Sequence, residues 1–416
     1  MLKITKTSLA AIVSVAKKAS GSGQLSYQLV HLRVNGNVIS AVCFNGEFGI
    51  EARAPITGEL LAKEELDIYV DAKTLYEMIS PMGDVIDLTP NDRNITLSTG
   101  HTLAELNAVE GAILPEIADP AAKLVVSMPG AVFKSLATVA EFASEDKARP
   151  VLQTIVLVLG QQTAQAVAAD GYSSAIIEEK MTVLSENAGK SYQIPARLFR
   201  APLNIQDLAG DKDSVTIKAV ENRLIFEIVG DGKNVSVTTP LVGEAFPLKA
   251  VVGMIEQAKK GAPKASTTIN RDSLMKMIAQ VSAMGGQKQM FMTSQGQTCW
   301  ASSARLTSGF TYGILSAGVT GEGLKVWVST EIMKRLDTPL AASNAGVLKF
   351  SAGTAPLLVE IGQFACLLMP MVVPGKDPIT FGEAGLTVAA RVVAPVETTV
   401  TSPAGVVSVA APVEAS

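Results

Sequence analysis

The acidic turn at residues 170–174 is the first place where this sequence offers side chains for chemistry. Asp170-Gly171-Tyr172-Ser173-Ser174 combines a carboxylate with several hydroxyl groups, as a hydrolytic site would. Nucleophilic catalysis also needs a base beside the nucleophile. The chain has only two histidines, His31 and His101, both distant in sequence from the turn. An Asp-Gly pair between apolar runs is typical of a turn between strands. We therefore interpret these residues as a turn, and a hydrolase using Asp170 or Ser173 stays as a rival hypothesis.

Metal and phosphate chemistry find little support elsewhere in the chain. The acidic groups 64–67 and 145–146 lack the spacing of metal ligands. Gly230-Asp231-Gly232-Lys233 has the form of a hairpin turn and not of a phosphate-binding loop. The three cysteines, Cys43, Cys299 and Cys366, are far apart and form neither a metal motif nor a disulfide framework. We predict no enzymatic activity, no metal and no cofactor, and we expect a reducing cytoplasm as the location.

The composition indicates a multidomain protein with aliphatic cores. The chain has 416 residues, of which 48% are hydrophobic and only 5% aromatic, and this length is enough for two to four domains. We find no apolar run that would span a bilayer and no signal peptide. The net charge of −4 is unusual for a protein that binds DNA through an open face. It still allows DNA contact if positive charge is concentrated on one surface.

One helical pattern occurs three times, which predicts an internal repeat. Apolar residues follow the i, i+3, i+4, i+7 spacing of a buried helix face at residues 8–19, 132–144 and 273–284. The first copy carries Leu9, Ile12, Val13 and Ala16. Gly21 and Gly23 end the first helix, and Gly285-Gly286 ends the third.

A second pattern, a strand that passes directly into a helix, recurs with a similar period. It occurs at residues 69–75, 193–199 and 327–333, and an alternating strand follows each copy. We predict an α+β fold of three similar domains, each with two helices packed on antiparallel sheets. The predicted domains are 1–122, 123–255 and 266–373, with a linker at 256–265 that is rich in Lys, Gly and Pro. We interpret 374–416, rich in Ala, Val, Pro and Thr, as a disordered tail.

Two separated motifs resemble the bacterial DNA sliding clamp, the β subunit of DNA polymerase III. Arg149-x-x-Leu152 followed by Asp170-Gly171 is similar to the middle domain of these clamps. Leu367-Leu368-Met369-Pro370-Met371 is similar to the strand that closes their last domain. Three repeats per chain match the same family. The resemblance implies a homodimeric, head-to-tail ring with helices inside and sheets outside, which encircles double-stranded DNA and binds a DNA polymerase and a clamp loader.

The resemblance also implies a DNA-facing set of basic residues on the inner helices and their loops. Such side chains neutralise phosphates without reading sequence. They are equally consistent with ordinary solvated helix faces. The candidates are Lys17, Lys18, Lys73, Lys134, Lys147, Arg149, Arg197, Arg200, Arg271, Lys276, Lys334 and Arg335. The loop Ser20–Gln24 carries no charge, although family members often have a basic residue there.

The resemblance further implies a groove between the second and third domains that takes a short partner peptide with apolar anchors. Leu and Met side chains would make such a groove adaptable. Several of the same residues are also plausible core residues. The candidates are Leu152, Gly171, Tyr172, Ser174, Pro247, Leu367, Leu368, Met369, Pro370 and Met371. Tyr172-Ser173 stands where family members usually have a basic pair, which fits the partners of a virus- or plasmid-encoded clamp.

For the subunit interface, the resemblance implies edge strands of the first and third domains. We expect Leu103 and Leu106 on one edge and Met275 near the other. The main rival to a clamp is a virion structural protein, which the low aromatic content and the Ala/Val/Thr-rich tail would permit.

Overall fold

The computed structural model describes residues 2–56, 66–91, 93–100, 102–230, 232–283, 289–295, 298–305, 309–316, 319–321, 324–351 and 354–371. The predicted tail at 374–416 lies outside these residues. The described part is an α+β fold in which one order of elements occurs three times: strand, helix, four strands, helix, three strands.

The first two units follow this order with few additions. The first contains β1 (Leu2–Thr5), α1 (Lys6–Lys17), β2 (Leu29–Asn35), β3 (Val38–Phe44), β4 (Gly49–Pro55), β5 (Asp67–Asp71), α2 (Ala72–Ile79), β6 (Val85–Pro90), β7 (Asn94–Thr99) and β8 (Thr102–Asn107). The second contains β9 (Lys123–Pro129), α3 (Gly130–Ala137), β10 (Thr154–Leu159), β11 (Thr163–Ala169), β12 (Ser173–Lys180), β13 (Ser191–Pro195), the 3₁₀ turn η5 (Ala196–Phe199), β14 (Ser214–Val220), β15 (Arg223–Gly230) and β16 (Lys233–Pro240).

The third unit adds one short strand and splits its second helix in two. It contains β17 (Ala265–Asn270), α5 (Arg271–Ala283), β18 (Gln289–Gln295), β19 (Thr298–Arg305), β20 (Gly309–Ser316), β21 (Val319–Gly321), β22 (Leu324–Ser329), α6 (Thr330–Lys334), α7 (Asp337–Ser343), β23 (Ala345–Phe350), β24 (Leu357–Ile361) and β25 (Phe364–Leu368).

The predicted helix faces pack into the core. Leu9, Ile12, Val13 and Ala16 of α1 are buried, and α5 buries Leu274, Met277, Ile278 and Val281 at the same spacing. The second unit departs from the prediction, because α3 ends at Ala137 and continues as the 3₁₀ turn η2 (Thr138–Phe142). Its second helix is only the single turn η5. Pro202 follows shortly after, and a proline restricts the residue before it to extended conformations.

Helix α4 (Leu248–Lys260) was not predicted. It crosses the predicted domain boundary at residue 255 and occupies half of the predicted linker. Val251 and Ile255, one turn apart, are its buried residues, and Gly261 ends it. The linker is therefore partly an ordered helix that packs on the second and third units.

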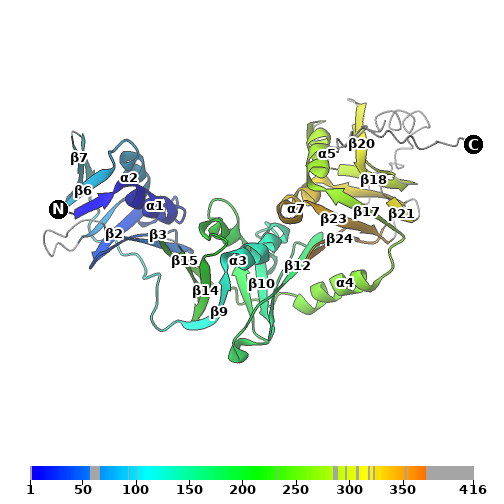
Figure 1. Ribbon diagram of the computed structural model, residues 1–416, viewed down its shortest axis with the longest axis horizontal. Coiled ribbons are helices and arrows are strands. Elements are labelled where there is room, and N and C mark those ends of the chain that lie inside the picture. The colour runs from blue at the N-terminus through cyan, green and yellow to red at the C-terminus, as the bar shows by residue number, and fades with distance from the viewer. Residues whose placement is uncertain are drawn as a thin grey trace, which may run out of the picture.

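The units join by sheet continuation. Strand β4 pairs with β16 through residues 49–53 and 234–238, which makes an eight-stranded sheet across the first and second units. Strand β12 pairs with β25 through residues 173–177 and 364–368, which makes a nine-stranded sheet across the second and third. Figure 1 shows the three units along an arc, with α1, α3, α5 and α7 toward its inner side and α4 on the outer side.

Candidate partner groove and inner basic face

The predicted turn at Asp170 is present and tightly bonded. The Asp170 carboxylate accepts hydrogen bonds at Oδ1 from the backbone N–H of Tyr172 (2.7 Å) and of Ser173 (2.6 Å). Gly171 has φ of +93°, a conformation that glycine adopts without the steric cost of a Cβ. The turn leaves Tyr172 exposed and directs Asp170 inward, where it is buried. The turn joins β11 to β12, which pair antiparallel, and β10 pairs antiparallel with β11, so the predicted turn between strands is confirmed.

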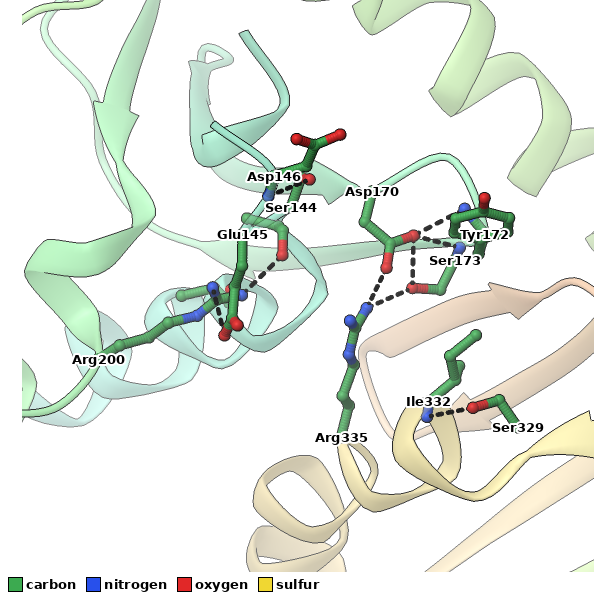
Figure 2. A network of polar contacts seen from close by, with 12 residues as sticks. Ser144, Glu145, Asp146, Asp170, Tyr172, Ser173, Arg200, Ser329, Ile332 and Arg335 are labelled. Atoms are coloured by element: carbon green, nitrogen blue, oxygen red, sulfur yellow. Dashed lines mark hydrogen bonds and ion pairs between the residues drawn. The ribbon is translucent and has the colours of Figure 1, made fainter. Parts of the chain in front are cut away.

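The inward carboxylate of Asp170 binds an arginine from the third unit. Arg335 follows α6, and its Nη1 lies 2.5 Å from Asp170 Oδ2 and 2.8 Å from Ser173 Oγ (Figure 2). The side chains of Arg335 and Asp170 are only 23% and 8% exposed. This pair lies at the β12–β25 junction, so it ties the turn of one unit to the helix of the next.

The C-terminal strand brings the two halves of the predicted groove together. In the β12–β25 register, Ser174 lies opposite Leu367 and Ser173 opposite Leu368. Beyond the strand, the N–H of Met369 donates to the carbonyl oxygen of Tyr172 (2.9 Å). Exposed Tyr172 and Met369 are therefore neighbours across the junction, 62% and 42% exposed respectively.

The other predicted groove residues divide between surface and core. Leu367 and Leu368 are buried, and Leu367 belongs to an outer apolar cluster with Val156, Val167, Ile176 and Ala365. Leu152 is partly buried against this cluster, and Ser174 is buried as well. Pro247 is exposed and directly precedes α4, whereas Pro370 and Met371 are half-buried. The side chains that a partner can reach are thus chiefly Tyr172, Met369 and Pro247.

Helix α4 covers the outer apolar cluster, a feature that the sequence analysis missed. Its Val251 and Ile255 pack on the cluster together with Phe246. Beside Tyr172, a polar hollow of about 230 Å³ runs from the loop at 144–149 to Arg335. Within that loop, Arg149 lies 3.6 Å from Asp146.

Most of the predicted basic residues already have a partner within the chain. Lys17 lies over the ring of Tyr76, and Lys18 Nζ donates to the carbonyl oxygen of Leu203 (3.2 Å). Ion pairs join Lys73 to Glu77 (3.9 Å), Lys134 to Asp211 (2.8 Å), Arg271 to Asp337 (2.7 Å) and Arg197 to Glu47. Within the described part of the chain, Lys147, Lys276 and Lys334 are exposed and show no ion pair.

Two of the predicted DNA-facing arginines are better explained as structural. Arg200 donates to the carbonyl oxygens of Ala140 and Ala143 and lies 3.4 Å from Glu145. Its burial lowers the pKa of the guanidinium from its usual value, which still leaves it charged at neutral pH. Arg335 is held by Asp170. The guanidinium groups of both side chains are thus engaged within the chain.

The predicted interface residues lie in different environments. Leu103 is 66% exposed on β8, an edge strand of the sheet β1-β6-β7-β8, whereas Leu106 of the same strand is buried. Met275 lies on α5, which packs against β20, the edge strand of the third unit's four-stranded sheet, so its place near that interface stays a prediction. The helices of the described ranges are also too short and too polar to span a membrane.

No family model and no curated protein sequence matches this chain. Solved structures do. The DNA polymerase III β subunit of Thermotoga maritima superposes with a TM-score of 0.75 at 15% identity, over 89% of this chain and 99% of that chain. The sliding clamp of Bacillus subtilis gives 0.75 at 16%, over 89% and 98%. A Pseudomonas aeruginosa sliding clamp bound to griselimycin gives 0.76 at 15%, over 89% and 99%. At these identities the likeness shows that the chain has the sliding-clamp fold.

Proposed function

We propose that this chain is a DNA sliding clamp, a non-enzymatic processivity factor that encircles double-stranded DNA and tethers a DNA polymerase. The likeness to clamp structures across nearly their whole length supports this proposal. A tether raises the effective concentration of the polymerase at its template. A clamp loader would open the ring, and the place of action would be the cytoplasm.

The way in which the sheets continue from unit to unit carries the proposal. In the first unit, strands in the order β1-β6-β7-β8 form a first sheet, and strands in the order β5-β2-β3-β4 form a second. The other two units have counterparts of both sheets. The last strand of the second sheet pairs with the last strand of the next unit's first sheet, as β4 does with β16 and β12 with β25. The third unit leaves β20 at a sheet edge, and the first leaves β8.

The same rule, applied once more, pairs β20 of one copy with β8 of another. This contact would turn two four-stranded sheets into one of eight strands. Because the contact joins unlike ends of the chain, it closes into a ring when the rotation per unit fits. We propose that two chains of three units form that ring. The inner helices and the loop at 144–149 would then face DNA, with Lys147, Lys276 and Lys334 as the phosphate-neutralising side chains.

The decisive experiment compares retention on circular and linear DNA. A closed ring stays on nicked circular DNA and slides off when the circle is cut, whereas an open-face binder dissociates equally from both. We expect a dimer by light scattering and loss of protein on linearisation, after loading by the cognate loader. Large assemblies that form without DNA would instead support the virion protein.

Variants at the edge of β8 test the ring directly. Leu103→Lys places a charge on the proposed contact strand, and we expect a monomer that is not retained on circles. Leu124→Lys is the matched control, because Leu124 is also an exposed leucine on an edge strand, β9, outside the proposed contact. Loss of dimer in both variants, or in neither, would remove β8 from the interface.

A further inference from the structure

We propose that Arg335 is a positioning residue for the partner groove, and that its bond across the junction sets the affinity for a partner peptide. This inference rests on the proposed function, because it assigns a role within the groove of a clamp. The Arg335 side chain is mostly covered, and its Nη1 is bound to Asp170 and Ser173. It would act through the turn that carries Tyr172.

The bonding around Asp170 transmits the position of Arg335 to Tyr172. One carboxylate oxygen of Asp170 is held by Arg335, and the other accepts the N–H of Tyr172. Ser173 closes the network, because its Oγ lies within hydrogen-bond distance of both Asp170 Oδ1 (3.1 Å) and Arg335 Nη1 (2.8 Å). Figure 2 shows Arg335 reaching from below the turn, with Tyr172 and Ser173 to the right of the carboxylate.

A second set of contacts connects the groove to α6, the helix that precedes Arg335. Tyr172 accepts the N–H of Met369, and the N–H of Met371 donates to the carbonyl oxygen of Trp327 (2.8 Å). Trp327 lies on β22, which leads through the capping residue Ser329 into α6 and so to Arg335. Both exposed apolar residues, Tyr172 and Met369, are therefore connected by hydrogen bonds and by the chain to β22 and α6 of the third unit.

The equivalent turn of the first unit shows which part of the network is local. Asn45 stands at the position of Asp170, and its Oδ1 accepts the N–H groups of Glu47 (3.1 Å) and Phe48 (2.8 Å). Gly46 has φ of +94°, which matches Gly171. A neutral amide is thus enough to hold this turn. The charge of Asp170 is needed only for the bond to Arg335, so Asp170→Asn separates the two roles.

The test measures peptide affinity and local order in full-length variants. The probe is a fluorescein-labelled short peptide with apolar anchor residues, and its binding is followed by fluorescence anisotropy. We expect Arg335→Gln and Asp170→Asn each to weaken binding about tenfold, in the usual range for coupling between sites. Arg335→Lys should recover part of the loss because it keeps the charge. Hydrogen exchange of the amides at 171–173 and 369 should rise in the weakened variants.

Arg223→Gln is the matched control. Arg223 makes a 2.8 Å ion pair with Asp119 away from the groove, and this pair is somewhat more exposed than the pair of Arg335 with Asp170. It should leave both the affinity and the exchange at 171–173 unchanged. An equal loss of peptide affinity in Arg335→Gln and Arg223→Gln would mean that Arg335 contributes only to the general stability of the protein. If the wild type binds the probe and Arg335→Gln binds it equally well, the role of Arg335 is overturned while the proposed clamp function stands. A wild-type protein that does not bind the probe, yet is retained on circular DNA, also overturns it while the clamp stands. Failure of both assays removes the clamp as well.

Discussion

The two junctions between units are built on one plan but have opposite chemistry on their outer faces. At the first junction, Val42 lies between His31 and Glu51 in the strand register. At the second, Val167 lies in the same way between Val156 and Ile176. Glu51 is buried and bonded by Arg53, whereas Ile176 belongs to the outer apolar cluster. Equivalent positions therefore hold a buried glutamate paired with a partly exposed arginine in one case and an apolar floor in the other.

The coverings of the two faces differ to match. A loop at 114–118 lies over the polar face, where Ile117 approaches Gly49 so closely that a Cβ there would meet its Cδ1 at 2.2 Å. Helix α4 lies over the apolar face. Sheet continuation alone therefore makes a junction. The second junction adds an apolar floor with exposed Tyr172 and Met369 beside it, and this is where we propose that a partner binds.

Exchanging the equivalent residues Glu51 and Ile176 should give the largest difference in the free energy of unfolding between the two junctions. Ile176→Glu buries a carboxylate with no arginine beside it, and we expect a loss of about 4 kcal/mol in the free energy of unfolding. Glu51→Ile removes a carboxylate whose partners Arg33 and Arg53 are partly exposed and can reach water, so the loss should be about 1 kcal/mol. Urea unfolding of both variants measures the difference. Similar losses would show that the two faces are energetically alike.

Helix α4 and the loop at 114–118 should differ in how much their buried side chains contribute to stability. Ile255→Ala deletes a fully buried side chain of α4, at an expected cost of about 3 kcal/mol. Ile117→Ala should cost about 2 kcal/mol, because a loop can collapse into the space more easily than a helix. Met254→Ala, on the exposed side of α4, is the control and should stay within about 0.5 kcal/mol of the wild type. Thermal and urea unfolding would rank the three.

The ion pairs that cross the two junctions should follow their burial. Arg335→Gln leaves the buried Asp170 without its charged partner, and we expect a loss of about 2 kcal/mol. Arg197 pairs with Glu47 across the first junction, but its side chain is 63% exposed. Arg197→Gln should therefore cost less than about 1 kcal/mol. A larger loss in Arg197→Gln, measured by urea unfolding, would reverse this assignment.

The sequence predicted those features that depend on local period. The apolar stripes of α1 and α5 were predicted because Leu9 to Ala16 and Leu274 to Val281 repeat at the spacing of a helix face. The Asp170-Gly171 turn was predicted because Asp-Gly between apolar runs has a specific backbone preference. Helix α4 was missed because its buried stripe is only Val251 and Ile255, between lysines and an exposed methionine. Its stability comes from the cluster beneath it, which no local pattern reveals.

The pairing of Asp170 with Arg335 was beyond sequence reasoning for a different reason. The two residues are 165 positions apart, and neither position alone differs from an ordinary surface charge. The repeat contained one usable signal. Arg197, at the second helix of the second unit, contacts the turn of the first unit at Glu47, and Arg335 follows the second helix of the third unit. Comparing equivalent turns with the next unit's helix would have suggested the contact.

The buried thiols offer the most delicate test of the comparison, because each reports on a different unit. Cys366 lies on β25 opposite Ala175 of β12, within the second junction, whereas Cys43 lies on β3, inside the first unit. Burial raises the pKa of Cys43 to about 12 and raises that of Cys366 as well. At pH 8 both groups are therefore protonated in the folded state, and a thiol reagent reacts only after local opening.

The measurement uses Cys299→Ser protein, so that only these two thiols are followed. We expect Arg335→Gln to speed labelling of Cys366 about tenfold, since about 1.4 kcal/mol of lost local stability corresponds to that factor, and to leave Cys43 unchanged. Equal acceleration at both thiols would mean that the chain opens as a whole, and that Arg335 does not act on the second junction in particular.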